Sequence, residues 1–270
     1  MSLLLHISDT HFGTEQAAVV AALQALARER LPDVLVLSGD ITQRARRAQF
    51  EAARRLCNRL GIARMLALPG NHDIPLFDLL ARLARPYANY LEAFGPQLEP
   101  TLETDDFLVI GVNTTRAWRH KNGEVSPEQV RRVADRLHRA RPRQLRIVVT
   151  HQPAAVLRRE DEHDRLRGAG PALQAWSGAG ADLVLGGHIH LPYVADLRAG
   201  PQPTPRPMWC VQAGTAVSFR VRYGTSNSVN LIHWNAAPPG QPRECRVERC
   251  DYRPDKGWFE TAETLRLALG

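Results

Sequence analysis

Short apolar runs alternate with longer stretches rich in Ala, Leu and Arg through the first two thirds of the chain. The runs predicted to be buried strands are residues 3–7, 34–37, 65–68, 107–112, 147–150 and 182–185. Between them, residues 15–30 and 45–60 contain helix formers without an internal Gly or Pro. Ser126, Pro127 and Gln129 form the start of a further helix, with a capping box and a proline in the first turn. This alternation predicts right-handed βαβ units and a parallel sheet.

The last third of the chain has a different pattern. Short strand-like runs follow one another there without intervening helices, at residues 191–197, 208–213, 217–223, 228–234 and 245–252. Strands in series favour antiparallel pairing, and we expect them to form a second sheet packed on the first. Because there is no linker and no internal repeat, we predict one domain over residues 1–270.

Polar residues follow five of the predicted strands at the point where each strand ends. They are Asp9, His11, Asp40, Asn71, His72, Asp73, His151, His188 and His190. In open parallel sheets, ligands bind beyond the carboxyl ends of the strands, so we expect these side chains to converge on one site.

The spacing of these residues is suited to metal binding. Asp9 and His11 are two residues apart, so in extended backbone their side chains project to the same side and can bind one ion. His188 and His190 repeat this spacing, and Asp40 is placed to bridge two ions. Nitrogen and oxygen donors without a thiolate favour Mn, Fe, Zn or Ni over a structural zinc site.

In order, the motifs are ISDTHFG, SGDIT, PGNHD, THQP and GGHIH. The ordered set resembles the calcineurin-like metallophosphoesterases, and within them it looks most like the bacterial class III cyclic-nucleotide phosphodiesterases. The resemblance implies an α/β fold, a four-layer αββα sandwich of two packed mixed β-sheets flanked by helices. It also implies two divalent metal ions, Mn²⁺ or Fe²⁺/Fe³⁺, with Zn²⁺ or Ni²⁺ as alternatives.

The family pattern assigns a role to each motif residue. One metal ion would be bound by Asp9, His11, Asp40 and His190, and the other by Asp40, Asn71, His151 and His188. His72 would face the substrate and assist the leaving group or the phosphoryl oxygens. Asp73 either orients His72 for catalysis or caps the segment that begins near Ile74, and the sequence leaves these alternatives open.

The resemblance implies a metal-dependent phosphodiesterase that acts through a metal-bridging hydroxide. The expected substrate is a small anionic phosphoester, and the motif order favours cyclic AMP, hydrolysed to AMP. A UDP-2,3-diacylglucosamine hydrolase, or another hydrolase of small phosphodiesters or pyrophosphates, is the alternative. It is disfavoured because no second acidic residue closely follows Asp40 and no amphipathic insertion is evident. A non-catalytic scaffold is disfavoured because every expected ligand and His72 are present.

Composition narrows the range of partners. The net charge of +7 and the pI of about 9.7 fit an anionic substrate, although an Arg-rich proteome also explains them. No basic run is interleaved with aromatic residues, so no nucleic-acid groove is indicated. Four cysteines are too few for a disulfide scaffold, and no run is long and apolar enough for a transmembrane segment. We therefore expect a cytoplasmic enzyme and leave a homodimer through an edge strand open.

Other residues have less specific patterns. His6 lies inside a predicted strand, and we expect it to be packed in the core. Segment 116–120 follows a strand end and segment 158–168 follows His151 closely, so either can form part of the rim of the site. The five tryptophans are more easily explained by packing than by base stacking.

Overall fold

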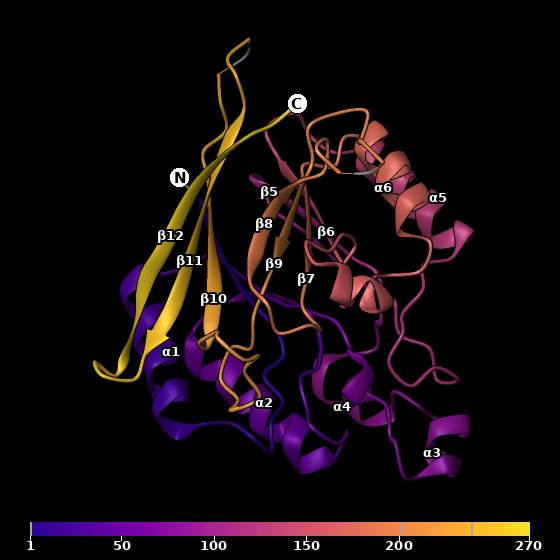
Figure 1. Cartoon of the computed structure of the whole chain (residues 1–270), viewed down its shortest axis with the longest axis vertical. Helices are drawn as coiled ribbons and strands as arrows, with labels where there is room; N and C mark the ends of the chain where they lie inside the picture. Colours follow the sequence, from indigo (N-terminus) through magenta and orange to yellow (C-terminus); the bar gives the residue numbers. More distant parts are fainter. Residues whose placement is uncertain (1, 201, 239) are drawn as a thin grey trace.

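The computed structural model describes residues 2–200, 202–238 and 240–270, and it contains two six-stranded β-sheets packed face to face (Figure 1). The first sheet has the order β12-β11-β10-β1-β2-β3. Its strands are β1 (Ser2–Ile7), β2 (Val34–Leu37), β3 (Arg64–Ala67), β10 (Ser228–Trp234), β11 (Glu244–Arg253) and β12 (Trp258–Ala268). β1, β2 and β3 are parallel, and β10 to β12 extend the sheet from β1 as antiparallel strands.

The second sheet has the order β4-β5-β6-β7-β9-β8. Its strands are β4 (Thr101–Glu103), β5 (Phe107–Gly111), β6 (Leu145–Val149), β7 (Leu183–Gly186), β8 (Tyr193–Asp196) and β9 (Trp209–Gln212). β5, β6, β7 and β9 are parallel, whereas β4 and β8 are antiparallel edge strands. Both sheets are therefore mixed, and the predicted fold class is confirmed.

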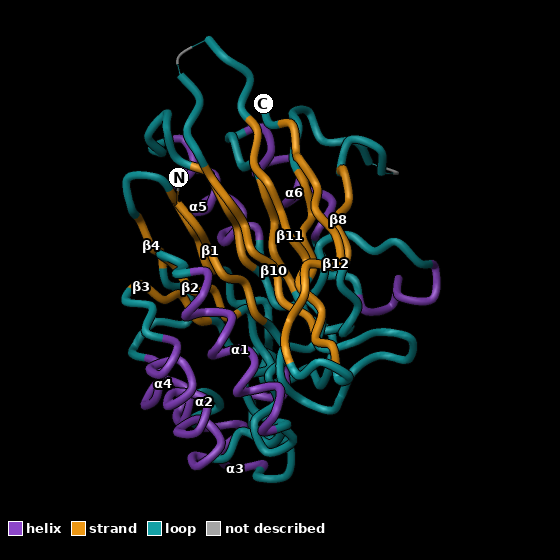
Figure 2. The backbone as a smooth tube through the Cα atoms, turned by 90° about the vertical axis from the view of Figure 1, so that its left-hand side faces the viewer, coloured by secondary structure: helices purple, strands orange, loops and turns teal. Residues whose placement is uncertain are grey.

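The helices are α1 (Ala17–Arg30), α2 (Arg47–Leu60), α3 (Leu79–Ala84), α4 (Ala88–Phe94), α5 (Pro127–His138) and α6 (Ala169–Gly178), with 3₁₀ turns η1 (Asn71–Asp73) and η2 (Arg159–Asp164). α1, α2 and α4 lie on the outer side of the first sheet and α5 and α6 on that of the second, whereas α3 lies apart from both (Figures 1 and 2). One apolar cluster joins α1, α2 and α4 to the first sheet, and a second joins α5 and α6 to the second sheet. A third cluster fills the space between the sheets. The four layers are thus helices, sheet, sheet and helices.

Local sequence accounts for the helices that carry an apolar stripe. In α2, Phe50, Ala53, Leu56 and Leu60 are buried at helical spacing, and the helix ends at Gly61 in the left-handed conformation, φ 72°. The capping box predicted at Ser126 is present at the start of α5.

The prediction for the last third was partly wrong. Its strands do not form one sheet of their own: β8 and β9 join the second sheet, with β9 parallel to β7, and β10 to β12 join the first. Residues 217–223 are not a strand, because their backbone forms only the isolated bridge between Glu15 and Ser218. Helices α3 and α4 and strands β4 and β12 were not predicted.

Candidate metal centre

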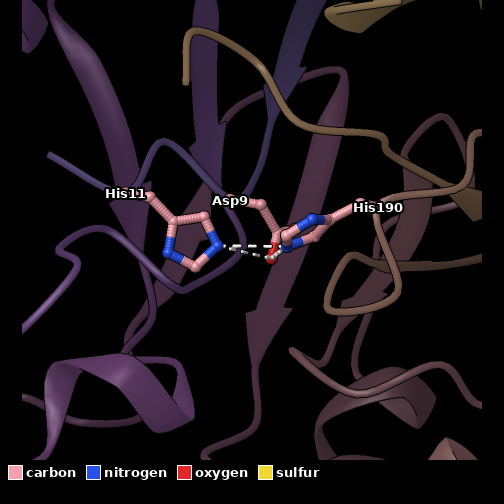
Figure 3. Close-up of side chains that lie close together, drawn as sticks. All are labelled: Asp9, His11 and His190. Atoms are coloured by element: carbon pink, nitrogen blue, oxygen red, sulfur yellow. Dashed lines mark hydrogen bonds and ion pairs between the residues drawn. The ribbon is translucent and has the colours of Figure 1, made fainter. Parts of the chain in front are cut away.

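The predicted ligands lie where strands of the two sheets end at the same side of the sandwich. Asp9, His11 and His190 form one group, in which Nε2 of His190 is 3.3 Å from Oδ1 of Asp9 and 3.0 Å from Nε2 of His11 (Figure 3). Oδ2 of Asp40 lies 3.8 Å from Nε2 of His11. Because the donor atoms point at one another from β1 and β7, they can bind one cation together.

A second group surrounds the other oxygen of Asp40. Nε2 of His151 lies 3.3 Å from Oδ1 of Asp40 and 3.2 Å from Oδ1 of Asn71, and His188 completes this group. Nδ1 of His151 is 3.0 Å from the carbonyl oxygen of Ser38. This contact orients the imidazole ring and leaves Nε2 free to bind a metal ion. Asp40 therefore presents one carboxylate oxygen to each group, an arrangement in which it can bridge two ions.

The backbone at these ligands has an unusual conformation. Asp9, His11, Asp40, His188 and His190 all have positive φ, between 41° and 73°. In non-glycine residues this conformation costs about 1–3 kcal/mol each, and it is concentrated at functional sites. Hydrogen bonds between the loops maintain it, including one from the backbone N–H of His188 to Oδ2 of Asp9, 2.9 Å.

Glycines allow the loops from the two sheets to approach each other. A Cβ atom at Gly39, where φ is 111°, would overlap the imidazole of His151. A Cβ atom at Gly187 would overlap Oγ of Ser8 and Oδ2 of Asp9. Both positions therefore require a residue without a side chain.

The chemistry of the donor set fits divalent metal ions. Oδ1 of Asp9 and both ring nitrogens of His188 are buried without a hydrogen-bond partner in the described structure, which is costly unless a cation binds them. Burial lowers the pKa of His11 to about 3, so its imidazole is neutral. Burial also opposes charge on His151, but the carboxylates of Asp40 and Asp9 outweigh it and raise its pKa to about 9. The carboxylates thus favour a positive charge at His151, which a bound metal ion would supply in place of the proton.

His72 and Asp73 have different surroundings. The ring of His72 lines the pocket, and its Nε2 lies 3.4 Å from Nη1 of Arg220. The carboxylate of Asp73 is buried and accepts hydrogen bonds from the backbone N–H groups of Gly70, Ile41 and Thr42 and from the Thr42 hydroxyl. None of its described hydrogen bonds goes to His72. These hydrogen bonds join Asp73 to the loop after β2 and to the start of η1, and none of them caps the segment that begins near Ile74. Which of the two expected roles Asp73 has stays a prediction.

The ligand groups lie at the base of a pocket of about 600 Å³. Apart from Ile189, the described residues that line it are polar or charged: Asp40, Gln43, Arg44, Asn71, His72, His120, Lys121, Asp161, Asp164, His188, His190, Arg220 and Arg222. Lys121 pairs with Asp164, and Arg222 pairs with Asp161. In the described part of the chain, Arg44 and Arg220 make no ion pair. These two cations are therefore available to an anionic ligand.

The two candidate rim segments contribute unequally. Arg116 and Arg119 both pair with Glu124, so neither is free for substrate, whereas His120 lines the pocket. From segment 158–168, Asp161 and Asp164 line the pocket. Oδ1 of Asp164 is 3.6 Å from Nε2 of His188, which places a carboxylate beside a predicted ligand.

Sequence reasoning missed Gln43, Arg44, Arg220 and Arg222. Arg220 and Arg222 lie in the segment that was predicted to be a strand. A signal was present, because polar and apolar residues alternate there and the two arginines share one side.

Comparison with known proteins agrees with this geometry. A model of the calcineurin-like phosphoesterase family matches residues 3–192. The chain therefore belongs to this family.

Individual relatives are more distant. Over 84 residues, the chain is 40% identical to the glycerophosphodiester phosphodiesterase GpdQ of Enterobacter lignolyticus (strain SCF1). That match covers 26% of this chain and 29% of the relative, so it spans less than a third of the relative's length.

Two solved structures share the fold. Purple acid phosphatase PPD1 from yellow lupin (Lupinus luteus) has a TM-score of 0.72 at 10% identity, covering 99% of this chain and 53% of that one. A dimetal phosphatase from Danio rerio has a TM-score of 0.66 at 12% identity, and the match covers 100% of this chain and 99% of that one. Among the described residues, no helix has the length and apolarity that crossing a bilayer requires.

Proposed function

We propose that this chain hydrolyses small phosphodiesters with two divalent metal ions, Mn²⁺ or iron, bound by the two ligand groups. The observation that carries the proposal is the position of Asp40, whose two carboxylate oxygens each lie within 3.8 Å of a histidine from a different group. Two ions held in this way would supply Lewis acidity and an activated water for attack on phosphorus.

The remaining residues of the pocket bind and orient the substrate. Arg44 and Arg220 would attract the phosphodiester anion, because no carboxylate in the described structure neutralises them. His72 lies next to the ligand Asn71 and its ring is 4.8 Å from that of His11. From there it would contact the leaving group or a phosphoryl oxygen. Its role is therefore chemical rather than structural.

Cyclic AMP is the first candidate substrate. The order of the motifs favours it, and a 3′,5′-cyclic nucleotide presents a single anionic phosphodiester in a compact ring. His120, which lines the pocket beside Lys121, would lie near the nucleoside.

A glycerophosphodiester is the second candidate, and two observations favour it. One is the local match of 40% identity to a glycerophosphodiester phosphodiesterase. The other is the polar lining of the pocket, in which Ile189 is the one apolar residue among the described lining residues. Glycerol hydroxyls suit such a lining, whereas a purine ring is usually held by apolar or aromatic side chains.

A hydrolysis panel tests the proposal. Protein reconstituted with Mn²⁺ is assayed on cyclic AMP, glycerophosphocholine, UDP-2,3-diacylglucosamine and p-nitrophenyl phosphate. We expect kcat/KM for one of the two small diesters to exceed that for the monoester at least tenfold. If the monoester is the best substrate, the phosphodiesterase proposal is wrong. If UDP-2,3-diacylglucosamine is the best substrate, both candidates are wrong.

A further inference from the structure

Most of the large apolar side chains that are exposed in the described structure lie on segments close to the metal pocket; Leu31 and Trp258 do not. Positions 118, 157 and 219–223 adjoin residues that line this pocket, and segment 74–83 adjoins a small neighbouring pocket that shares Arg44, His72 and His120 with it. The exposed apolar side chains on these segments are Phe77, Leu79, Leu80, Leu83, Trp118, Leu157, Phe219, Val221 and Tyr223. This distribution corrects one expectation, because Trp118 is not packed in the core. Exposed apolar side chains that gather near a pocket are typical of an interaction site.

Helix α3 carries the largest part of this surface. Leu80 and Leu83 are each 82% exposed, and no residue of the helix is buried. Arg82 donates hydrogen bonds to the carbonyl oxygens of Pro75 and Arg119, so α3 is tied to the segment that presents Trp118. We call Phe77, Leu79, Leu80, Leu83 and Trp118 the apolar rim.

Charge around the apolar rim identifies the kind of surface that would cover it. The guanidinium of Arg44 lies 5.2 Å from the ring centre of Phe77, and Arg82 and Arg85 are on and beside α3. The carboxylate in this segment, Asp78, accepts a hydrogen bond from the backbone of α3 as its N-cap. Leucine, phenylalanine and tryptophan interspersed with arginine are typical of segments that lie in the interface of an anionic bilayer.

A second copy of the chain fits this surface less well. In a two-fold dimer the same surface meets itself, so Arg82 and Arg85 of one copy would lie near their own equivalents. No acidic cluster on the apolar rim would compensate for that repulsion, since Asp78 is its one acidic residue in residues 74–86.

We propose that the face around the metal pocket docks on an anionic phospholipid bilayer through the apolar rim. On the other side of the pocket, Phe219 and Tyr223 are 64% and 102% exposed, while Arg220 and Arg222 between them line the pocket. The bilayer would therefore contact both sides of the pocket mouth and place it at the level of the lipid headgroups. This inference concerns binding and does not depend on which phosphodiester is hydrolysed.

Vesicle sedimentation tests the proposal. The full chain is mixed in EDTA with vesicles of phosphatidylglycerol and phosphatidylcholine, or of phosphatidylcholine alone. EDTA removes divalent metal ions, so the metal centre can neither bind lipid phosphate groups nor hydrolyse them. Any binding that is measured is therefore independent of catalysis. We expect binding to the anionic vesicles, weakened by salt, and about tenfold or more weaker binding by the double variant Leu80→Ser/Leu83→Ser. Leu31→Ser is the matched control, because Leu31 is 75% exposed away from the pocket, and it should bind like the unmodified chain.

Three results would overturn the proposal. The first is failure of the unmodified chain to bind anionic vesicles, and the second is equal binding by the double variant. The third is a dimer of the unmodified chain in analytical ultracentrifugation that the double variant dissociates, because a second copy would then cover the apolar rim. Quenching of tryptophan fluorescence by brominated lipids gives a second measurement. It should fall in Trp118→Phe and persist in Trp258→Phe.

Discussion

The guanidinium of Arg220 and the imidazole of His72 are held together by Gln43. Nη1 of Arg220 lies 3.4 Å from Nε2 of His72 and donates to Oε1 of Gln43 at 2.7 Å. Nδ1 of His72 lies 3.1 Å from the carbonyl oxygen of Gln43. Because a carbonyl oxygen only accepts, Nδ1 carries the hydrogen and Nε2 accepts from Arg220. The ring of His72 is thus oriented through both nitrogens.

This pair predicts coupled effects on turnover. His72→Ala should keep both metal ions and reduce kcat about 10²-fold on diesters with poor leaving groups. Arg220→Gln should reduce kcat/KM, and the loss in the double variant should be smaller than the product of the single losses. Steady-state kinetics on a dialkyl diester and on bis(p-nitrophenyl) phosphate measures these effects.

The two leaving groups separate the roles of His72. A general acid matters less for p-nitrophenolate, so a smaller loss on that substrate supports protonation of the leaving group. Equal losses support stabilisation of a phosphoryl oxygen. Loss of metal from His72→Ala would contradict its assignment, and independent effects of the two substitutions would contradict the coupling.

The bridging position of Asp40 predicts the metal content of variants. We expect two ions per chain, since the two oxygens of this carboxylate lie beside histidines of two different groups, His11 and His151. Asp40→Ala should lose both ions, whereas Asp9→Ala should lose mainly one. Elemental analysis after reconstitution measures this, with Asp105→Ala as the control because that side chain is 96% exposed. Retention of one tightly bound ion by Asp40→Ala would argue against a shared ligand.

Gly187 provides a test of the close approach between the loops. Gly187→Ala would force a methyl group against Ser8 and Asp9. We expect this clash to lower the unfolding free energy by about 1–3 kcal/mol and to weaken binding of the metal ion assigned to Asp9 and His190. Gly178→Ala is the matched control, because nothing lies within 4 Å of the new methyl group in α6. That substitution should raise the unfolding free energy by about 0.5–1 kcal/mol. Urea unfolding measures both, and equal stability of the two variants would contradict the packing.

His6 predicts a pH dependence of stability. It is buried in β1, with Nε2 2.9 Å from Oγ of Ser38, and burial lowers its pKa from 6.5 to about 3. Below pH 6.5, His6 is therefore protonated in the unfolded chain but stays neutral in the folded chain. The contribution of His6 to the unfolding free energy is fully present above pH 6.5. It is lost as the pH falls toward 3, by up to about 1.4 kcal/mol per pH unit.

The variant His6→Gln isolates this effect. In metal-free protein its unfolding free energy should depend less steeply on pH between about 6.5 and 3, measured by urea unfolding. His138→Gln is the control, because that side chain is exposed and makes no ion pair in the described structure, so the slope should not change. An unchanged slope in His6→Gln would show that its burial has no role in acid stability.

The sequence predicted which residues converge at the candidate metal centre better than it predicted the rest of the pocket lining, for a physical reason. Asp9, Asp40 and His151 directly follow buried strands, so their positions depend on local pattern and on the common direction of parallel strands. Arg44 and Arg220 reach the pocket from long loops, and their positions depend on contacts with Gln43 and Phe77 that no local pattern encodes.

The errors in the fold have similar causes. Residues 217–223 have the alternation of a strand, but a strand needs a neighbour that continues the hydrogen bonding along its length. Here the pairing stops at the single bridge between Glu15 and Ser218, which the sequence does not show. β12 was missed because polar residues such as Thr261 and Glu263 occupy much of this exposed edge strand. Helix α3 was missed because it has six residues, Leu79–Ala84, which is too short for a helical spacing of apolar residues to be recognised.

The division of the ligands between the two sheets has a kinetic consequence. Asp9, Asp40 and Asn71 follow strands of the first sheet, whereas His151, His188 and His190 follow strands of the second. Neither group is complete until both sheets have formed and packed, so metal ions would bind only after the transition state for folding has been crossed. Interactions absent from the transition state slow unfolding without accelerating folding. The lifetime of the folded chain should therefore depend on the metal supply, while the time it takes to fold should not.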